Sequence, residues 1–292
     1  MSAAVNKAVK YALDSAYAAE PDRAGIRRWV RPVHPAQRTI APVLSLSFMR
    51  FNDKVCLVTG GTSGIGQAVC LRLGAEGGQV IAVGRDKVDG AETVRLIVKA
   101  GGKAMFLACD LAKPRAITAT VQKVLAKFGR IDVLICDAAM MTFDPLLKLP
   151  LPQWDLLMLV NLRSLAQLTQ LCLPHMPKGS AIVAVSSVHA HQTTANVVPY
   201  ATSKGGMEAF VRGMSQELDF RHTRINAVAP GAVDTPMLWS NPNVKSGAEK
   251  IDKASVGTPK ELAAAIAFLA SADASFVHGT TLVVDGGRLA QL

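Results

Sequence analysis

The chain has 292 residues, of which 50% are hydrophobic and 18% are charged, so it has enough apolar side chains for a large folded core. This composition excludes a disordered chain, a collagen-like repeat and a disulfide-rich miniprotein. The net charge is +10, but the basic residues form no long run, which favours a generally solvated surface over a nucleic-acid interface.

The longest uncharged apolar stretches, such as residues 40–49, are shorter than the roughly 20 residues that a membrane-spanning helix needs, so no membrane span is expected. The five cysteines are odd in number and form no CxxC motif. They predict reduced, buried thiols in a cytoplasmic protein rather than disulfides or zinc ligands.

Residues 1–48 differ from the rest of the chain, because they combine several prolines with the arginines Arg23, Arg27, Arg28 and Arg31. Three interpretations of this N-terminal extension stay open: a basic organelle-targeting presequence, a flexible appendage, and a native chain that starts at Met49. Residues 49–292 are predicted to form one folded domain.

From residue 54 onward, short apolar runs rich in Val and Ile alternate with amphipathic stretches. The apolar runs are those expected of strands buried on both faces of a parallel sheet, and they lie at residues 54–59, 79–83, 104–108, 131–135, 181–185, 224–228 and 281–284. The stretches between them predict helices at about 64–77, 87–100, 114–128, 152–175, 199–219 and 259–271. This alternation predicts an α/β fold: a single doubly wound Rossmann-type domain with a mainly parallel seven-stranded sheet. Residues 232–257 are predicted to be a long loop that closes over a ligand.

The first predicted strand runs directly into the glycine-rich sequence TGGTSGIG at residues 59–66. Such a turn, followed by a helix N-terminus, is a preferred phosphate site in open α/β sheets. Gln67 rather than Lys follows Gly66, which excludes a Walker A loop. An S-adenosylmethionine site would need an acid at the end of the second strand, where Gly84 and Arg85 stand instead.

Arg85 favours NADP(H) over NAD(H), because a guanidinium attracts the 2′-phosphate that an acidic residue would repel. The alternative is that Arg85 faces solvent and Asp86 binds the ribose.

Tyr200 and Lys204 are four residues apart in a predicted helix, so they share one face. A nearby ammonium is expected to lower the pKa of the phenol, which would then exchange a proton with a carbonyl oxygen. Ser187 follows the fifth predicted strand, where its hydroxyl can hydrogen-bond a substrate oxygen.

With these motifs in this order, residues 50–290 resemble the classical short-chain dehydrogenases/reductases. The resemblance also includes Asp110, Asn161, Pro230-Gly231 and Thr235. It implies that Tyr200 is the general acid/base, that Lys204 lowers its pKa and holds the nicotinamide ribose, that Ser187 polarises the substrate carbonyl, and that Asn161 holds a water in a proton relay. The residues it places around the cofactor are Gly60, Thr62, Ser63, Gly64, Ile65, Gly66, Arg85, Asp110, Leu111, Ala138, Tyr200, Lys204, Pro230, Gly231, Val233 and Thr235.

One segment departs from the family pattern: Cys136-Asp137-Ala138-Ala139 stands where the family usually has Asn-Asn-Ala-Gly. Ala139 cannot adopt a glycine-only backbone conformation without strain, and Asp137 adds negative charge near the cofactor. Weaker cofactor binding or a shifted loop is therefore expected.

These features predict an NADP-dependent carbonyl reductase or alcohol dehydrogenase that acts on a small ketone or secondary alcohol without a metal. A 3-oxoacyl-carrier-protein reductase, a sugar or polyol dehydrogenase, and a catalytically silent cofactor-binding regulator remain alternatives. His189 and His191 are expected at the pocket rim, and an apolar wall is expected from Met140, Met141, Phe143, Met237, Leu238 and Trp239. The resemblance also implies a homotetramer in which the 152–175 and 199–219 helices pair across subunits.

Overall fold

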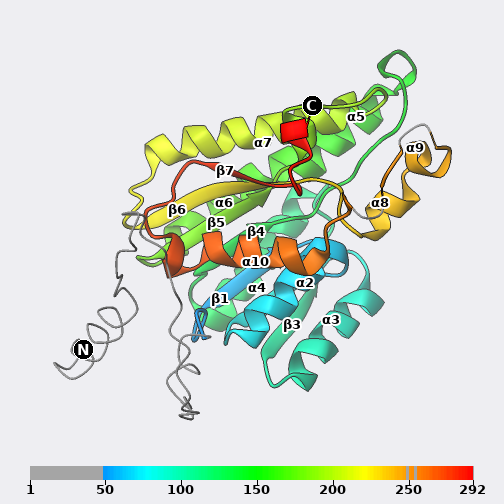
Figure 1. Ribbon diagram of the computed structural model, residues 1–292. Coiled ribbons are helices and arrows are strands. Elements are labelled where there is room, and N and C mark those ends of the chain that lie inside the picture. Colours follow the sequence, from blue (N-terminus) through cyan, green and yellow to red (C-terminus); the bar gives the residue numbers. More distant parts are fainter. Residues whose placement is uncertain (1–48, 248–249, 253–254, 292) are drawn as a thin grey trace, which may run out of the picture. The chain divides into compact units, whose positions relative to one another are not determined.

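The computed structural model describes residues 49–247, 250–252 and 255–291 (Figure 1). The three interpretations of residues 1–48 lie outside the described residues. The described chain contains a seven-stranded sheet in the order β3-β2-β1-β4-β5-β6-β7, in which every neighbouring pair is parallel. The expected doubly wound α/β sheet is therefore confirmed.

The strands coincide closely with the apolar runs of the sequence. They are β1 (Val55–Thr59), β2 (Gln79–Gly84), β3 (Lys103–Ala108), β4 (Val133–Cys136), β5 (Ser180–Val185), β6 (Thr223–Pro230) and β7 (Thr281–Val284). Each residue of β1, β4, β5 and β6 is buried, since both faces of these central strands are covered by helices.

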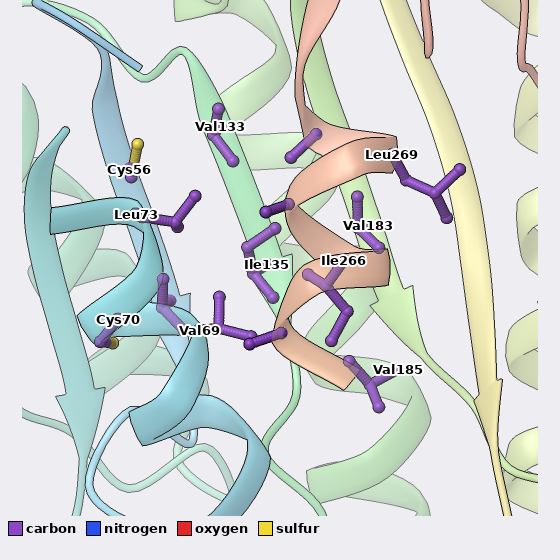
Figure 2. Close-up of a cluster of buried hydrophobic side chains, with 14 of the residues drawn as sticks. Cys56, Val69, Cys70, Leu73, Val133, Ile135, Val183, Val185, Ile266 and Leu269 are labelled. Atoms are coloured by element: carbon purple, nitrogen blue, oxygen red, sulfur yellow. The ribbon is translucent and has the colours of Figure 1, made fainter. Parts of the chain in front are cut away.

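Successive strand residues point to opposite faces, where two separate clusters of apolar side chains form. One cluster lies between the sheet and the helices α2 (Gly64–Ala75), α3 (Lys87–Lys99) and α10 (Pro259–Ala270). Figure 2 shows Val69 and Leu73 of α2 beside Ile266 of α10 over the strand residue Ile135. The second cluster joins the opposite face to α4 (Pro114–Phe128), α6 (Ser164–Cys172) and α7 (Val198–Glu217).

The predicted helix at 152–175 is interrupted. It consists of α5 (Leu151–Met158), a π turn at Leu159–Arg163 and α6. Within the described residues, Leu151–His175 is the one helical stretch with the length and apolar character of a membrane span. Leu165 and Leu168 are buried in the chain's own core, so this stretch packs as a core helix. These two leucines are therefore not available for the subunit pairing that the resemblance implies.

The stretch at 232–257 is less irregular than expected, because it contains the short helices α8 (Pro236–Ser240) and α9 (Pro242–Lys245). A parallel bridge pairs Val233 with Gly257. Backbone hydrogen bonds from Asp234 N to Gly257 O (2.9 Å) and from Gly257 N to Ala232 O (3.0 Å) reinforce it. Both ends of the segment are thus tied to each other.

The order in which strands are added to the sheet changes direction between β1 and β4: β2 and β3 lie on one side of β1, and β4 to β7 lie on the other. In open α/β sheets, this switch point creates a crevice outside the carboxyl ends of the strands. The glycine-rich turn, residues 137–139 and Ser187 all follow strands that end there.

Candidate active site

A cavity of about 870 Å³ opens at the carboxyl ends of the strands. It brings together segments that follow all seven strands of the described sheet. Of the residues predicted to be catalytic or to contact the cofactor, all line this cavity except Gly66 and Asn161. The predicted order of motifs therefore corresponds to one common site.

The glycine-rich turn is shaped by close backbone approach. Gly60 and Gly64 have φ values of 73° and 52°, which other residues adopt rarely. A Cβ on Gly66 would lie 2.2 Å from the carbonyl oxygen of Gly60, and a Cβ on Gly84 would lie 2.5 Å from Thr62 Cγ2. Gly60, Gly64 and Gly84 line the cavity, and the close packing of protein atoms behind the turn shapes a glycine-rich cradle there.

Helix α2 begins at this turn with its positive end toward the cavity. Its N-cap residue, Ser63, makes no side-chain capping hydrogen bond, and the first turn contains no acidic residue. The helix therefore carries no acidic side chain that would offset its dipole, which suits an anionic group such as a pyrophosphate.

Arg85 and Asp86 have different positions after β2. Arg85 is exposed and lines the cavity. Asp86 is the N-cap of α3, where its Oδ1 accepts hydrogen bonds from the backbone N–H groups of Val88 (2.8 Å) and Asp89 (3.0 Å). The carboxylate of Asp86 is thus engaged away from the cavity.

Ser187, Tyr200 and Lys204 converge at one wall of the cavity. Ser187 follows β5, and the other two residues are buried on α7. The Ser187 hydroxyl is near enough to the Tyr200 phenol to favour its phenolate form. Lys204 Nζ lies 5.5 Å from the centroid of the Tyr200 ring and donates a 2.6 Å hydrogen bond to Val185 O. A phenol, a hydroxyl and an amine therefore meet beside the glycine-rich cradle.

The expected lowering of the Tyr200 pKa is not found in this ligand-free cleft. Burial raises the pKa of Tyr200 to about 12, because desolvation outweighs the hydrogen bond with Ser187 that favours the phenolate. Burial also lowers the pKa of Lys204, while Asp137 opposes that shift. The Lys204 ammonium bonds to Val185 rather than approaching the phenol oxygen, so proximity along the helix alone does not produce a phenolate.

Asn161 lies in the π turn and is buried behind the cavity wall. Its Oδ1 accepts a hydrogen bond from Met140 N (2.8 Å), and its Nδ2 donates to Met140 O (2.9 Å) and to Ser203 Oγ (3.0 Å). Both of its amide hydrogens are used within the protein. In this structure Asn161 joins α7 to the segment after β4.

The backbone strain that was expected at residues 136–139 is not observed. Among the described residues other than glycine, only Asp53 and Asn196 have positive φ, so Ala139 needs no glycine-only conformation. Thr59 Oγ1 accepts a hydrogen bond from Ala138 N (3.3 Å). Together with the Met140 contacts of Asn161, this bond holds the segment from both ends.

Of the residues expected at the rim and the apolar wall of the pocket, only some line the cavity. His189, Met140, Met141, Met237 and Leu238 line it, whereas His191, Phe143 and Trp239 do not. The His191 ring lies 3.2 Å from Glu208 on α7, and the Trp239 indole donates to Asp234 (2.7 Å). The expectation was wrong for these three residues because sequence adjacency does not determine which side of a loop faces the cavity.

Other lining residues were not predicted, among them Gln192, Thr193 and Thr194 after η5 (Val188–Ala190), and Arg288 and Leu289 after β7. The consecutive glycines Gly286 and Gly287, both with positive φ, turn the chain back toward the cavity. This Gly-Gly pair was the available sequence signal. Among the described residues, no three His, Cys, Asp or Glu side chains cluster as metal ligands.

A family model described as enoyl-(acyl carrier protein) reductase matches residues 60–288. The chain is 36% identical over 243 residues to a 3-oxoacyl-[acyl-carrier-protein] reductase of Thermotoga maritima, a match that covers 82% of this chain and 99% of that protein. It is 34% identical over 247 residues to a cyclopentanol dehydrogenase of Comamonas, and this match covers 82% of this chain and 99% of that protein. A crystal structure of a short-chain dehydrogenase from Burkholderia cenocepacia in complex with NADP superposes with a TM-score of 0.76 at 29% identity, covering 81% of this chain and 98% of that one.

Proposed function

The chain belongs to the short-chain dehydrogenase/reductase family of oxidoreductases, and from this premise we propose that it is an NADP(H)-dependent carbonyl reductase or alcohol dehydrogenase for apolar ketones and secondary alcohols. The observation that carries the proposal is that Ser187, Tyr200 and Lys204 lie together at the wall of a glycine-lined cavity.

The cradle at Gly60, Gly64 and Gly84 supports a dinucleotide, because glycines at the cavity surface let a pyrophosphate approach the backbone closely. The pyrophosphate would be held by backbone N–H groups at the start of α2. Arg85 would bind the 2′-phosphate, and the capping role of Asp86 argues against its use as a ribose acceptor. When bound, the nicotinamide supplies or accepts the hydride.

The side chains of this protein would handle the proton. In carbonyl reduction, Ser187 would donate a hydrogen bond to the substrate oxygen, and Tyr200 would transfer its hydroxyl proton to the same atom. The high pKa of the phenol suits a general acid that stays protonated at neutral pH. Lys204 would stabilise the phenolate left behind, since its ammonium is buried within the same wall.

The substrate class follows from the lining of the cavity beyond Tyr200. Met141, Leu156, Met237 and Leu238 supply apolar surface there. This lining favours a hydrophobic ketone over a sugar or polyol, which would need more hydrogen-bonding partners. A 3-oxoacyl-carrier-protein reductase is the second candidate, supported by the Thermotoga relative. The homotetramer and the cytoplasmic location remain predictions.

A direct test follows NADPH oxidation by absorbance with cyclic and aliphatic ketones, 3-oxoacyl thioesters and ketoses. We expect turnover with the apolar ketones, and faster turnover with NADPH than with NADH. Preferred turnover of the thioesters would favour the second candidate. Tight NADPH binding without turnover of any substrate class would support the silent regulatory protein instead.

A further inference from the structure

A carboxyl group lies directly beneath the glycine-rich turn. It belongs to Asp137, which follows the last residue of β4 and lines the floor of the cavity. Its Oδ2 is 2.8 Å from the position of a Cβ on Gly60 and 2.6 Å from that of a Cβ on Gly66. The nearby backbone N–H of Gly66 favours the ionised form of this carboxyl group and so lowers its pKa, against the larger effect of burial. Asp137 therefore occupies the space that two glycines leave open and contacts the turn itself.

The position of Asp137 is fixed by its neighbours along the chain. Ala138 N donates to Thr59 Oγ1 (3.3 Å), and Met140 is held through both its N–H and its C=O by Asn161 (2.8 and 2.9 Å). These contacts hold the backbone that follows Asp137 in place beneath the turn.

The surroundings of the carboxyl group contain a second acceptor. The carbonyl oxygen of Gly60 lies 2.2 Å from the same Cβ position on Gly66 that is 2.6 Å from Asp137 Oδ2. Both oxygens therefore border the space beside Gly66. A carboxylate can only accept hydrogen bonds and places a negative charge near a carbonyl oxygen, whereas a carboxylic acid is uncharged and has an O–H to donate.

The titratable groups that face Asp137 come from three elements: Cys70 on α2, Cys136 on β4, and Tyr200 and Lys204 on α7. Burial raises the pKa of both thiols and of the phenol, so these three groups are neutral. Lys204 is the one cation among them and favours the ionised form of Asp137, yet its Nζ donates to Val185 O. Desolvation is the larger effect and raises the pKa of Asp137.

We propose that Asp137 is a positioning residue that supports the glycine-rich turn as a neutral carboxylic acid, and that loss of its proton weakens binding of the anionic cofactor. The carboxylate would place negative charge beneath the N–H groups that hold the pyrophosphate, and it would repel the Gly60 carbonyl. This inference rests on the proposed function only in taking NADPH as the ligand.

The test measures the dissociation constant of NADPH by fluorescence titration between about pH 6 and pH 9 for the wild type, Asp137→Asn and Asp137→Ala. For the wild type we expect binding to weaken about tenfold more over this range than for Asp137→Asn, whose amide keeps a donor and an acceptor without a charge. The 2′-phosphate of NADPH titrates equally in all variants, so the comparison cancels its contribution. Asp137→Ala should bind more weakly than Asp137→Asn at every pH, with an equally shallow profile. Equal pH profiles for the wild type and Asp137→Asn would overturn the inference.

A second readout uses the ligand-free protein. Because the pKa of Asp137 is raised on folding, its protonated form contributes stability that is complete below about pH 4 and is lost as the pH rises through the folded-state pKa. The melting temperature of the wild type should therefore fall relative to that of Asp137→Asn between about pH 4 and pH 8. A constant difference would overturn the neutral-acid assignment. If no variant bound NADPH at any pH, the proposed function would fail, and the melting curves alone would decide the state of Asp137.

Discussion

The ammonium nitrogen of Lys204 lies 5.5 Å from the centre of the Tyr200 ring and donates a 2.6 Å hydrogen bond to the carbonyl oxygen of Val185. Val185 is the last residue of β5, the strand that leads into Ser187. One strand end and one helix thus organise all three side chains. The lysine is tied to the backbone, and the phenol remains a neutral group in the ligand-free cleft.

Removal of the phenol hydroxyl should abolish most of the activity. For Tyr200→Phe we expect kcat to fall about a hundred- to ten-thousandfold, because the proton donor is lost. The affinity for NADPH and the melting temperature should change little, since the hydroxyl bonds to Ser187 at the cavity wall. Steady-state kinetics, NADPH titration and thermal denaturation measure the three quantities. Turnover within about twofold of the wild type would contradict the role of Tyr200.

The two reaction directions should respond differently to pH. Alcohol oxidation needs the phenolate as a base, and burial raises the pKa of Tyr200 to about 12. The kcat/KM for oxidation should therefore rise with pH, by up to about tenfold per unit, whereas the phenol required for reduction is present throughout. Ser187→Ala should move this rise to higher pH, because it removes a hydrogen bond that lowers the pKa of Tyr200. Thr202→Ala, on the exposed side of α7, is the control. A pH-independent oxidation rate would contradict the mechanism.

Arg85 should determine the preference between the two nicotinamide cofactors. For Arg85→Ala we expect KM for NADPH to rise at least about tenfold, which is the effect of losing a charge-assisted hydrogen bond to phosphate. KM for NADH should stay nearly constant. Arg95→Ala is a matched control, since Arg95 is an exposed residue of α3 that pairs with Glu92. Parallel increases for both cofactors would show that Arg85 does not contact the 2′-phosphate.

Asn161 should stabilise the fold as well as the site. Asn161→Ala removes the three hydrogen bonds of a buried side chain, to Met140 N, Met140 O and Ser203 Oγ. The free energy of unfolding should fall by about 2 to 4 kcal/mol in denaturant titration, because two partners at Met140 and one at Ser203 lose their bonds. Arg163→Ala changes an exposed side chain of the same π turn and should stay within about 0.5 kcal/mol of the wild type. Equal effects of the two substitutions would contradict this account.

Two glycine substitutions separate close packing from helix propensity. Gly66→Ala places a Cβ 2.2 Å from Gly60 O and 2.6 Å from Asp137 Oδ2, so the turn must shift. We expect NADPH affinity to fall at least about tenfold and the melting temperature to drop. Gly213→Ala on α7 meets no atom within 4 Å and should raise stability by up to about 1 kcal/mol, since alanine favours a helix. Unchanged NADPH binding by Gly66→Ala would show that the turn tolerates a side chain.

Much of this architecture could be predicted because it depends on local pattern. The runs that became β1, β2 and β5 are short and continuously apolar, as strands covered on both faces must be. The helices between them were located to within a few residues by their amphipathic spacing. The order of Gly60, Ser187, Tyr200 and Lys204 along these elements also placed them at one sheet edge, because parallel strands end on the same side.

Other features depended on distances between segments far apart in the chain. The sequence alone could not show that Asp137 packs beneath Gly66, that Asn161 binds Met140, or that Arg288 reaches the cavity. It also predicted the wrong direction for the pKa of Tyr200, because helical spacing reports how near Lys204 is but not how much water surrounds the phenol. Periodicity and motif order are properties of neighbouring residues and survive in the unfolded chain, whereas desolvation and cross-element contacts exist only once the strands and helices have packed.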